Sequence, residues 1–73
     1  MRELKISSEF IKLDSALKLA DIAQTGGHAK ILVQNGEIRV NGEVCTQRGK
    51  KLRPGDRLEF GRQIFVLKAA DGQ

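Results

Sequence analysis

The densest concentration of charge in this chain of 73 residues is a basic segment between positions 48 and 53. Four of its six residues are cations and none is acidic; the cations are Arg48, Lys50, Lys51 and Arg53. Such side chains neutralise the phosphates of a polyanion such as RNA. Gly49 supports this interpretation, because a backbone without a side chain can approach a phosphate closely. A solvated loop that keeps a small domain in solution explains the same charges equally well.

The charge of the whole chain is concentrated in its middle. The formal net charge is +4 and the isoelectric point is about 9.6. Residues 1–29 and 63–73 carry no net side-chain charge, whereas residues 30–62 hold eight basic and four acidic side chains. This asymmetry favours a polyanionic partner.

A second candidate anion site is the stretch Thr25-Gly26-Gly27-His28. Thr25 is a predicted helix N-cap, and the N–H groups of a first helical turn lack partners within the helix. Gly26 and Gly27 leave these donors uncovered, so an anion can reach them. The stretch is not a Walker loop, because no Gly-Lys-Ser/Thr follows at the required spacing. A plain helix cap is the simpler interpretation of these residues taken alone.

Signals for catalysis or metal binding are weak. His28 and Cys45 are single copies, so neither a metal shell nor a catalytic triad finds its partners. We expect His28 to be an exposed helix residue, Cys45 a small sheet residue, and Asp14 and Asp21 solvated acids. The sequence therefore predicts a protein without catalytic residues, metal or cofactor. One cysteine also rules out an internal disulfide, which fits a reducing cytoplasm.

The aromatic residues indicate which kind of nucleic acid fits. The chain has no Trp and no Tyr, and its three aromatics, Phe10, Phe60 and Phe65, stand in apolar patterns typical of a core. Modules that bind single strands need exposed rings on which bases stack. A basic surface without such rings favours recognition of structured RNA through its backbone and shape.

The elements that must position these residues follow from apolar spacing and turn signals. Period-two alternation predicts a strand over 3–6. Leu13, Ala16, Leu17 and Ala20 predict one helix face, with Asp14 capping its first turn and residues 24–27 ending it. A second helix follows Thr25, buries Ala29, Leu32 and Val33, and stops at Asn35-Gly36.

The second half of the chain is typical of a small sheet. Asn41-Gly42 predicts a hairpin whose turn residues both need positive φ, with Ile38 and Val40 before it and Val44 and Thr46 after it. A basic loop over 47–53 and a tight turn at Pro54-Gly55-Asp56 follow. Leu58 and Phe60 predict another strand, and residues 64–67 predict a buried or central one.

These elements predict one α+β domain over residues 1–73, with two short helices packed on a small, mostly antiparallel sheet. The longest uninterrupted apolar run is 64–67, which is far too short for a membrane span. The N-terminus also lacks the apolar stretch of a signal peptide. We therefore expect a cytoplasmic protein.

Several motifs follow one another in a characteristic order between Phe10 and Phe60. They are Ile11-Lys12-Leu13-Asp14 with Ala16-Leu17, Gly26-Gly27-His28-Ala29-Lys30, the run from Asn35 to Val44, Arg48-Gly49-Lys50-Lys51-Leu52, and Pro54-Gly55-Asp56. In the order of these motifs, more than in any one of them, the chain resembles the S4-type RNA-binding domain. The resemblance is greatest to the stand-alone bacterial, YbcJ-like members of that family, which also pair two glycines before the second helix.

The resemblance implies the αL-motif fold of that family and a monomeric, non-catalytic module that binds structured RNA, either ribosomal or transfer RNA. Its RNA-binding residues, transferred position by position and combined with the basic segment and the helix start, are Lys12, Thr25, Gly26, Gly27, Lys30, Arg39, Arg48, Gly49, Lys50, Lys51 and Arg53. Two departures stand out. Many relatives have arginine where this chain has Gly27-His28, and several have two basic residues in place of Gln47-Arg48.

Two alternatives without RNA stay open. One is a ubiquitin-like sulfur carrier, a small β-rich class that also has a Gly-Asp turn near its last strands. Such carriers need a C-terminal Gly-Gly, which Asp71-Gly72-Gln73 does not supply. The other is a module that docks on proteins.

Overall fold

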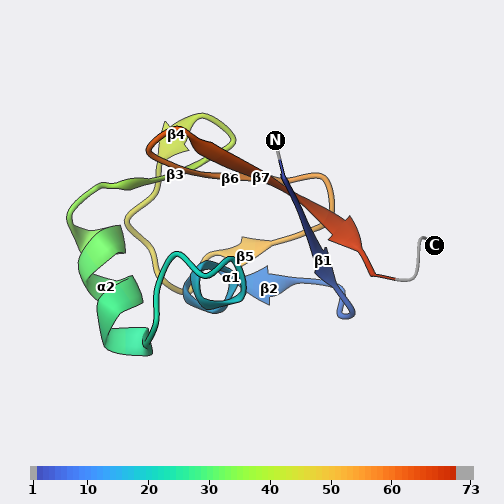
Figure 1. Ribbon diagram of the computed structural model, residues 1–73, viewed down its shortest axis with the longest axis horizontal. Coiled ribbons are helices and arrows are strands. Elements are labelled where there is room, and N and C mark those ends of the chain that lie inside the picture. The colour runs from blue at the N-terminus through green and yellow to red at the C-terminus, as the bar shows by residue number, and fades with distance from the viewer. Residues whose placement is uncertain (1, 71–73) are drawn as a thin grey trace.

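The computed structural model describes residues 2–70 as one five-stranded sheet, a separate two-stranded ribbon and two helices (Figure 1). The elements are β1 (Arg2–Ile6), β2 (Ile11–Lys12), α1 (Leu13–Leu19), α2 (Gly26–Gln34), β3 (Ile38–Val40), β4 (Glu43–Val44), β5 (Lys51–Leu52), β6 (Arg57–Phe60) and β7 (Gln63–Ala69). The sheet has the order β1-β7-β6-β3-β4, and β2 pairs with β5 in the ribbon. Only the β1–β7 pair is parallel. The predicted α+β class and mostly antiparallel sheet are confirmed.

The core lies between the sheet on one side and the helices and ribbon on the other (Figure 1). Alternating residues of the strands face it, and each buried leucine contributes roughly 1.5 to 3 kcal/mol relative to an exposed one. The buried residues are Leu4, Ile6, Leu13, Ala16, Leu17, Ala23, Ala29, Leu32, Val33, Ile38, Val40, Leu52, Leu58, Phe65 and Leu67. Every element except β2 and β4 contributes, so the ribbon is held to the sheet through this shared core.

Helix α2 has the predicted ends. The Thr25 hydroxyl accepts a hydrogen bond from the His28 N–H at 3.1 Å, which makes Thr25 the N-cap. At the other end Gly36 has φ +74°, where its N–H bonds to Val33 and the next N–H, of Glu37, bonds to Leu32. These two bonds form a Schellman motif, which suits glycine.

The hairpin between β3 and β4 also has the predicted turn, with φ of 53° at Asn41 and 88° at Gly42. The Asn41 side chain extends the role of this turn. Its Oδ1 accepts from the Arg57 N–H at 2.9 Å, and its Nδ2 donates to the Asp56 carboxylate at 3.2 Å. The hairpin is thereby fixed to the turn that follows the basic segment.

Helix α1 is shorter than the sequence predicts. It ends at Leu19, and Asp21 takes the left-handed conformation with φ 64°. The Asp21 N–H bonds to Lys18 and the Ile22 N–H bonds to Leu17, which is the same motif that ends α2. The predicted end at 24–27 is therefore wrong, because a left-handed aspartate carries no sequence signal comparable to glycine. Asp14 does lie in the first turn, where its carboxylate accepts the Ser15 N–H at 2.7 Å.

Two further expectations need correction. Residues 47–53 are not all loop, because Lys51–Leu52 forms β5. The return strand of the hairpin is Glu43–Val44 and does not reach Thr46.

Residues 71–73, on which the argument against a sulfur carrier depends, lie outside the described residues. None of the helices in residues 2–70 has the length and apolar character needed to cross a bilayer.

Candidate nucleic-acid interface

The β2–β5 ribbon divides its side chains between two faces. Ile11 pairs with Leu52, and Lys12 pairs with Lys51. Leu52 is fully buried and Ile11 packs against the core, so the other pair of side chains projects away from the core. Two ammonium groups directly opposite each other on one face repel. The fold therefore holds a like-charge pair together on an exposed surface.

The basic segment is fixed to the start of α1 by its backbone. The Leu13 N–H donates to the Lys50 carbonyl at 2.9 Å, and the Asp14 N–H donates to the Arg48 carbonyl at 3.1 Å. Lys12, the N-cap residue of α1, makes no side-chain capping bond. The carbonyl groups of the basic segment thus accept hydrogen bonds from the N–H groups at the start of α1. The same bonds order the backbone of the segment.

The other end of the segment is fixed by a turn. The Asp56 carboxylate accepts the Arg53 N–H at 2.8 Å, while the Asp56 N–H returns a bond to the Arg53 carbonyl at 3.0 Å. Gly55, with φ +100°, completes the predicted turn. The segment is therefore held at both ends, and its backbone needs little ordering before it binds an anion.

We call one set of exposed residues the basic surface; its members are Lys12, Arg48, Gly49, Lys50, Lys51 and Arg53. Within it, Lys12 and Lys51 share the outer face of the ribbon. Gly49 does not have positive φ, and a Cβ added there would meet no atom within 4 Å. The fold therefore does not require glycine at position 49.

Phe10 lies at this surface and not in the core, which corrects the sequence expectation. Phe65 is buried and Phe60 packs against the core, but Phe10 is half-buried and outside the core cluster. The ammonium of Lys51 lies 4.8 Å from the centroid of the Phe10 ring. Phe10 directly precedes β2, and its contact with Lys51, whose side chain projects from the outer face of the ribbon, places its ring at that face.

The start of α2 forms a second group of candidate residues. Thr25, Gly26, Gly27 and Lys30 are all exposed. The Thr25 hydroxyl accepts the His28 N–H as the N-cap of the helix, and the His28 Nδ1 accepts the Gln24 N–H at 3.3 Å. His28 is exposed on the helix, as predicted. A Cβ at Gly26 would meet nothing within 4 Å, and one at Gly27 only the Thr25 hydroxyl at 3.9 Å. Figure 1 shows this helix on the same side of the sheet as the ribbon.

The structure does not bring Arg39 to the basic surface. Its strand neighbours Ile38 and Val40 are buried, so Arg39 projects from the opposite face of the sheet. Its partner on β6 is Glu59, which stands between the buried Leu58 and Phe60, a ring that packs against the core. The core separates this face from the outer face of the ribbon, so the two point away from each other.

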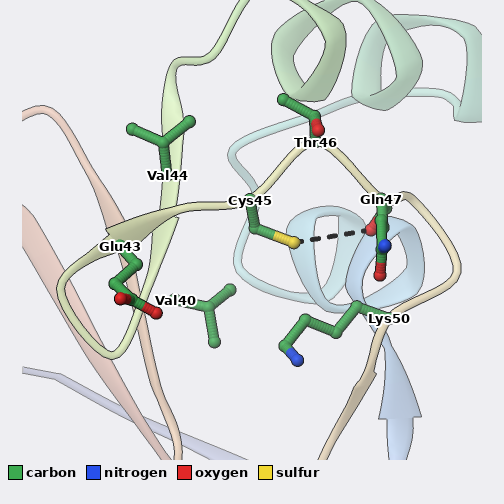
Figure 2. Close-up of a pocket in the computed structure, with 7 residues that line it drawn as sticks. All are labelled: Val40, Glu43, Val44, Cys45, Thr46, Gln47 and Lys50. Atoms are coloured by element: carbon green, nitrogen blue, oxygen red, sulfur yellow. Dashed lines mark hydrogen bonds between the residues drawn. The ribbon is translucent and has the colours of Figure 1, made fainter.

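A pocket of about 240 Å³, which sequence reasoning missed, lies between the hairpin and the basic segment (Figure 2). Lys50 lines it, together with Val40, Glu43, Val44, Cys45, Thr46 and Gln47. The half-buried Cys45 donates its N–H to Ile38 just beyond β4, and its thiol lies 3.7 Å from the Gln47 carbonyl. Within residues 2–70, no three His, Cys, Asp or Glu side chains gather as a metal ion requires.

Comparison with known proteins places this arrangement in a family. Residues 4–68 match the S4 domain. A protein of Bacillus subtilis (strain 168), named probable ribosome maturation protein RlbA, is 45% identical to this chain over 57 residues. The aligned region covers 78% of this chain and 80% of that protein. The family match spans both helices, the hairpin and the whole basic surface, and this chain belongs to the S4 domain family.

Proposed function

We propose that this protein binds structured RNA, without catalysing a reaction on it, through the basic surface and the N-terminal end of α2. Its family supports the proposal, since the S4 domain is the RNA-binding family that its motifs resemble. The proposed contacts on α2 are Thr25, Gly26, Gly27 and Lys30. Arg39 projects from the opposite side of the molecule, so this interface does not include it.

The observation that carries the proposal is the pairing of Lys12 with Lys51 across the ribbon. Two opposed ammonium groups repel each other and destabilise a strand pair. A phosphate bound between them attracts both groups and so offsets that repulsion. Each lysine offers three N–H donors, enough to contact oxygens of neighbouring phosphates. The pair is therefore better suited to an anionic partner than to the free protein.

Among structured RNAs, we propose ribosomal RNA in preference to transfer RNA. The support for this choice is the relative from Bacillus subtilis, whose name describes a probable ribosome maturation protein. Ribosomal RNA is extensively folded, which fits a protein that recognises an RNA by the spacing of its phosphates.

A competition experiment tests the preference for structure. A fluorescent RNA hairpin with a ribosomal RNA sequence is bound to the protein and displaced either by the unlabelled hairpin or by poly-uridine of equal length. We expect the hairpin to compete several-fold better, because a duplex fixes the spacing of phosphates and a flexible strand does not. Stronger competition by poly-uridine contradicts the proposal, and so does a hairpin that fails to bind. A transfer RNA competitor that outperforms the ribosomal hairpin contradicts only the choice of RNA.

A further inference from the structure

Phe10 is the aromatic side chain that the core does not use. The chain has three phenylalanines and no Trp or Tyr. Phe65 is 2% exposed and Phe60 packs against the core, but the described structure gives Phe10 no place in that cluster. A large apolar ring that adds little to the core and remains partly open to solvent is available to contact a ligand.

The surroundings of the ring indicate the chemistry of that ligand. The Lys51 ammonium lies 4.8 Å from the ring centroid, within the range of a cation–π contact. Lys12, the cross-strand partner of Lys51, shares the same outer face. Arg53, directly after β5, is exposed as well. The ring thus lies among cations on the face where the proposed function places phosphates.

We propose that Phe10 stacks an unpaired nucleobase while Lys51 and Lys12 contact the phosphates beside it. This inference rests on the proposed function and specifies its ligand as a folded RNA with an unpaired nucleotide next to a duplex. Every base has a π-face, so one ring accepts any of the four. In the free protein the Lys51 ammonium covers the ring. A phosphate is a stronger partner for this ammonium than an exposed ring is, so RNA binding draws the lysine away and opens the ring to the base.

A fluorescence measurement follows the ring directly. Because the chain has no Trp and no Tyr, a Phe10→Trp variant carries a single strong fluorophore at the proposed stacking position. The variant is titrated with a synthetic RNA hairpin whose stem holds one unpaired adenosine. The comparison RNA has an abasic residue at that position and therefore the same phosphates. We expect strong quenching by the first RNA and little by the second. A Gln63→Trp control, at an exposed position of β7, should respond equally weakly to both.

Affinities of a Phe10→Leu variant complete the test, because leucine keeps an apolar side chain and removes the ring. We expect this variant to bind the adenosine-containing hairpin about tenfold more weakly than the wild type, the scale of one lost stacking contact. Its affinity for the abasic hairpin should be unchanged. This pattern across two proteins and two RNAs isolates the contact between ring and base.

The remaining outcomes overturn the inference in distinguishable ways. If the wild-type protein binds both hairpins equally well and Phe10→Trp is quenched equally by both, stacking is refuted while the proposed function stands. The same holds if Phe10→Leu weakens binding of both RNAs alike, since the ring then acts only on the protein's own structure. If the wild-type protein binds neither hairpin, the proposed function fails and this inference fails with it.

Discussion

Gly49 occupies a position in the basic surface where the fold accepts a side chain. Its backbone is outside the left-handed region, and a Cβ would meet nothing within 4 Å. A Gly49→Ala variant should therefore be as stable as the wild type or about 0.4 to 1 kcal/mol more stable, because alanine restricts the unfolded chain. RNA affinity should nevertheless fall, since the methyl group keeps a phosphate from the backbone. Thermal unfolding and RNA anisotropy measure the two effects separately.

A second glycine variant serves as the control for that prediction. Gly42 has φ +88° in the hairpin turn, so Gly42→Ala should lower stability by about 1 kcal/mol or more. If Gly49→Ala binds RNA as tightly as the wild type, no phosphate approaches the backbone there.

Phe10 shows where sequence reasoning fails for a single residue. Phe10 and Ile11 are adjacent and both apolar, so alternation alone does not say which of them faces the core. The pairing of Ile11 with Leu52 decides it, and that partner lies far along the chain. The cations of the basic surface were predictable because their number and density are visible in the sequence itself.

At the scale of elements, the two helices differ in how well their ends are predictable. Helix α2 starts at a threonine cap and stops at Gly36, residues that the sequence makes conspicuous. Helix α1 ends at the left-handed Asp21, which resembles any other surface acid in the sequence. Strand β5 is not predictable from the local sequence either, since a two-residue strand is defined by its pairing with a partner, here β2.

The end of α1 gives a stability prediction. An aspartate with φ 64° carries strain that glycine avoids, while glycine gives more freedom to the unfolded chain. We expect Asp21→Gly to raise the free energy of unfolding by about 0.5 to 1 kcal/mol, because the strain is the larger of the two terms. Urea denaturation measures it. The control, Asp14→Gly inside the helix, should lower stability by roughly 0.5 to 1 kcal/mol, because glycine is the poorer helix former and removes the carboxylate that accepts the Ser15 N–H. Equal losses for both variants would contradict the conformation assigned to Asp21.

At the scale of the whole molecule, local patterns predict the class of fold but not which strands pair with each other. The parallel pairing of β1 with β7 joins the two ends of the described chain, and no local pattern specifies it. The candidate interface behaves similarly. The sequence identified its cations, whereas only the three-dimensional arrangement groups Lys12 with the basic segment and separates Arg39 from it.

The small size of the interface limits how strongly RNA binding depends on salt. The basic surface and Lys30 offer enough cations for about three to five phosphate contacts, so the logarithm of affinity should fall against the logarithm of salt concentration with a slope of roughly −3 to −4. Anisotropy titrations over a range of potassium chloride concentrations measure this slope. An affinity that does not change between low and moderate salt would exclude recognition through phosphates.

The most direct test of the central claim reverses the opposed lysine pair. In Lys12→Glu with Lys51→Glu, the ribbon keeps a like-charge pair, so its stability should stay within about 0.5 kcal/mol of the wild type. The matched control is Arg62→Glu with Lys68→Glu. Both residues are exposed; Arg62 lies in the turn between β6 and β7, and Lys68 lies in β7. Each double variant changes two cations to acids, from 13 basic and 9 acidic residues to 11 and 11, and so lowers the formal net charge from +4 to zero.

Binding of the RNA hairpin is then measured for both double variants, with circular dichroism to verify that each is folded. If the basic surface holds phosphates, the Lys12 and Lys51 variant should bind about 100-fold more weakly, roughly tenfold for each reversed contact. The Arg62 and Lys68 variant should lose much less, because only the long-range field of the protein changes. Equal losses in the two variants would show that net charge alone attracts the RNA, and an unchanged affinity in the first would contradict the interface.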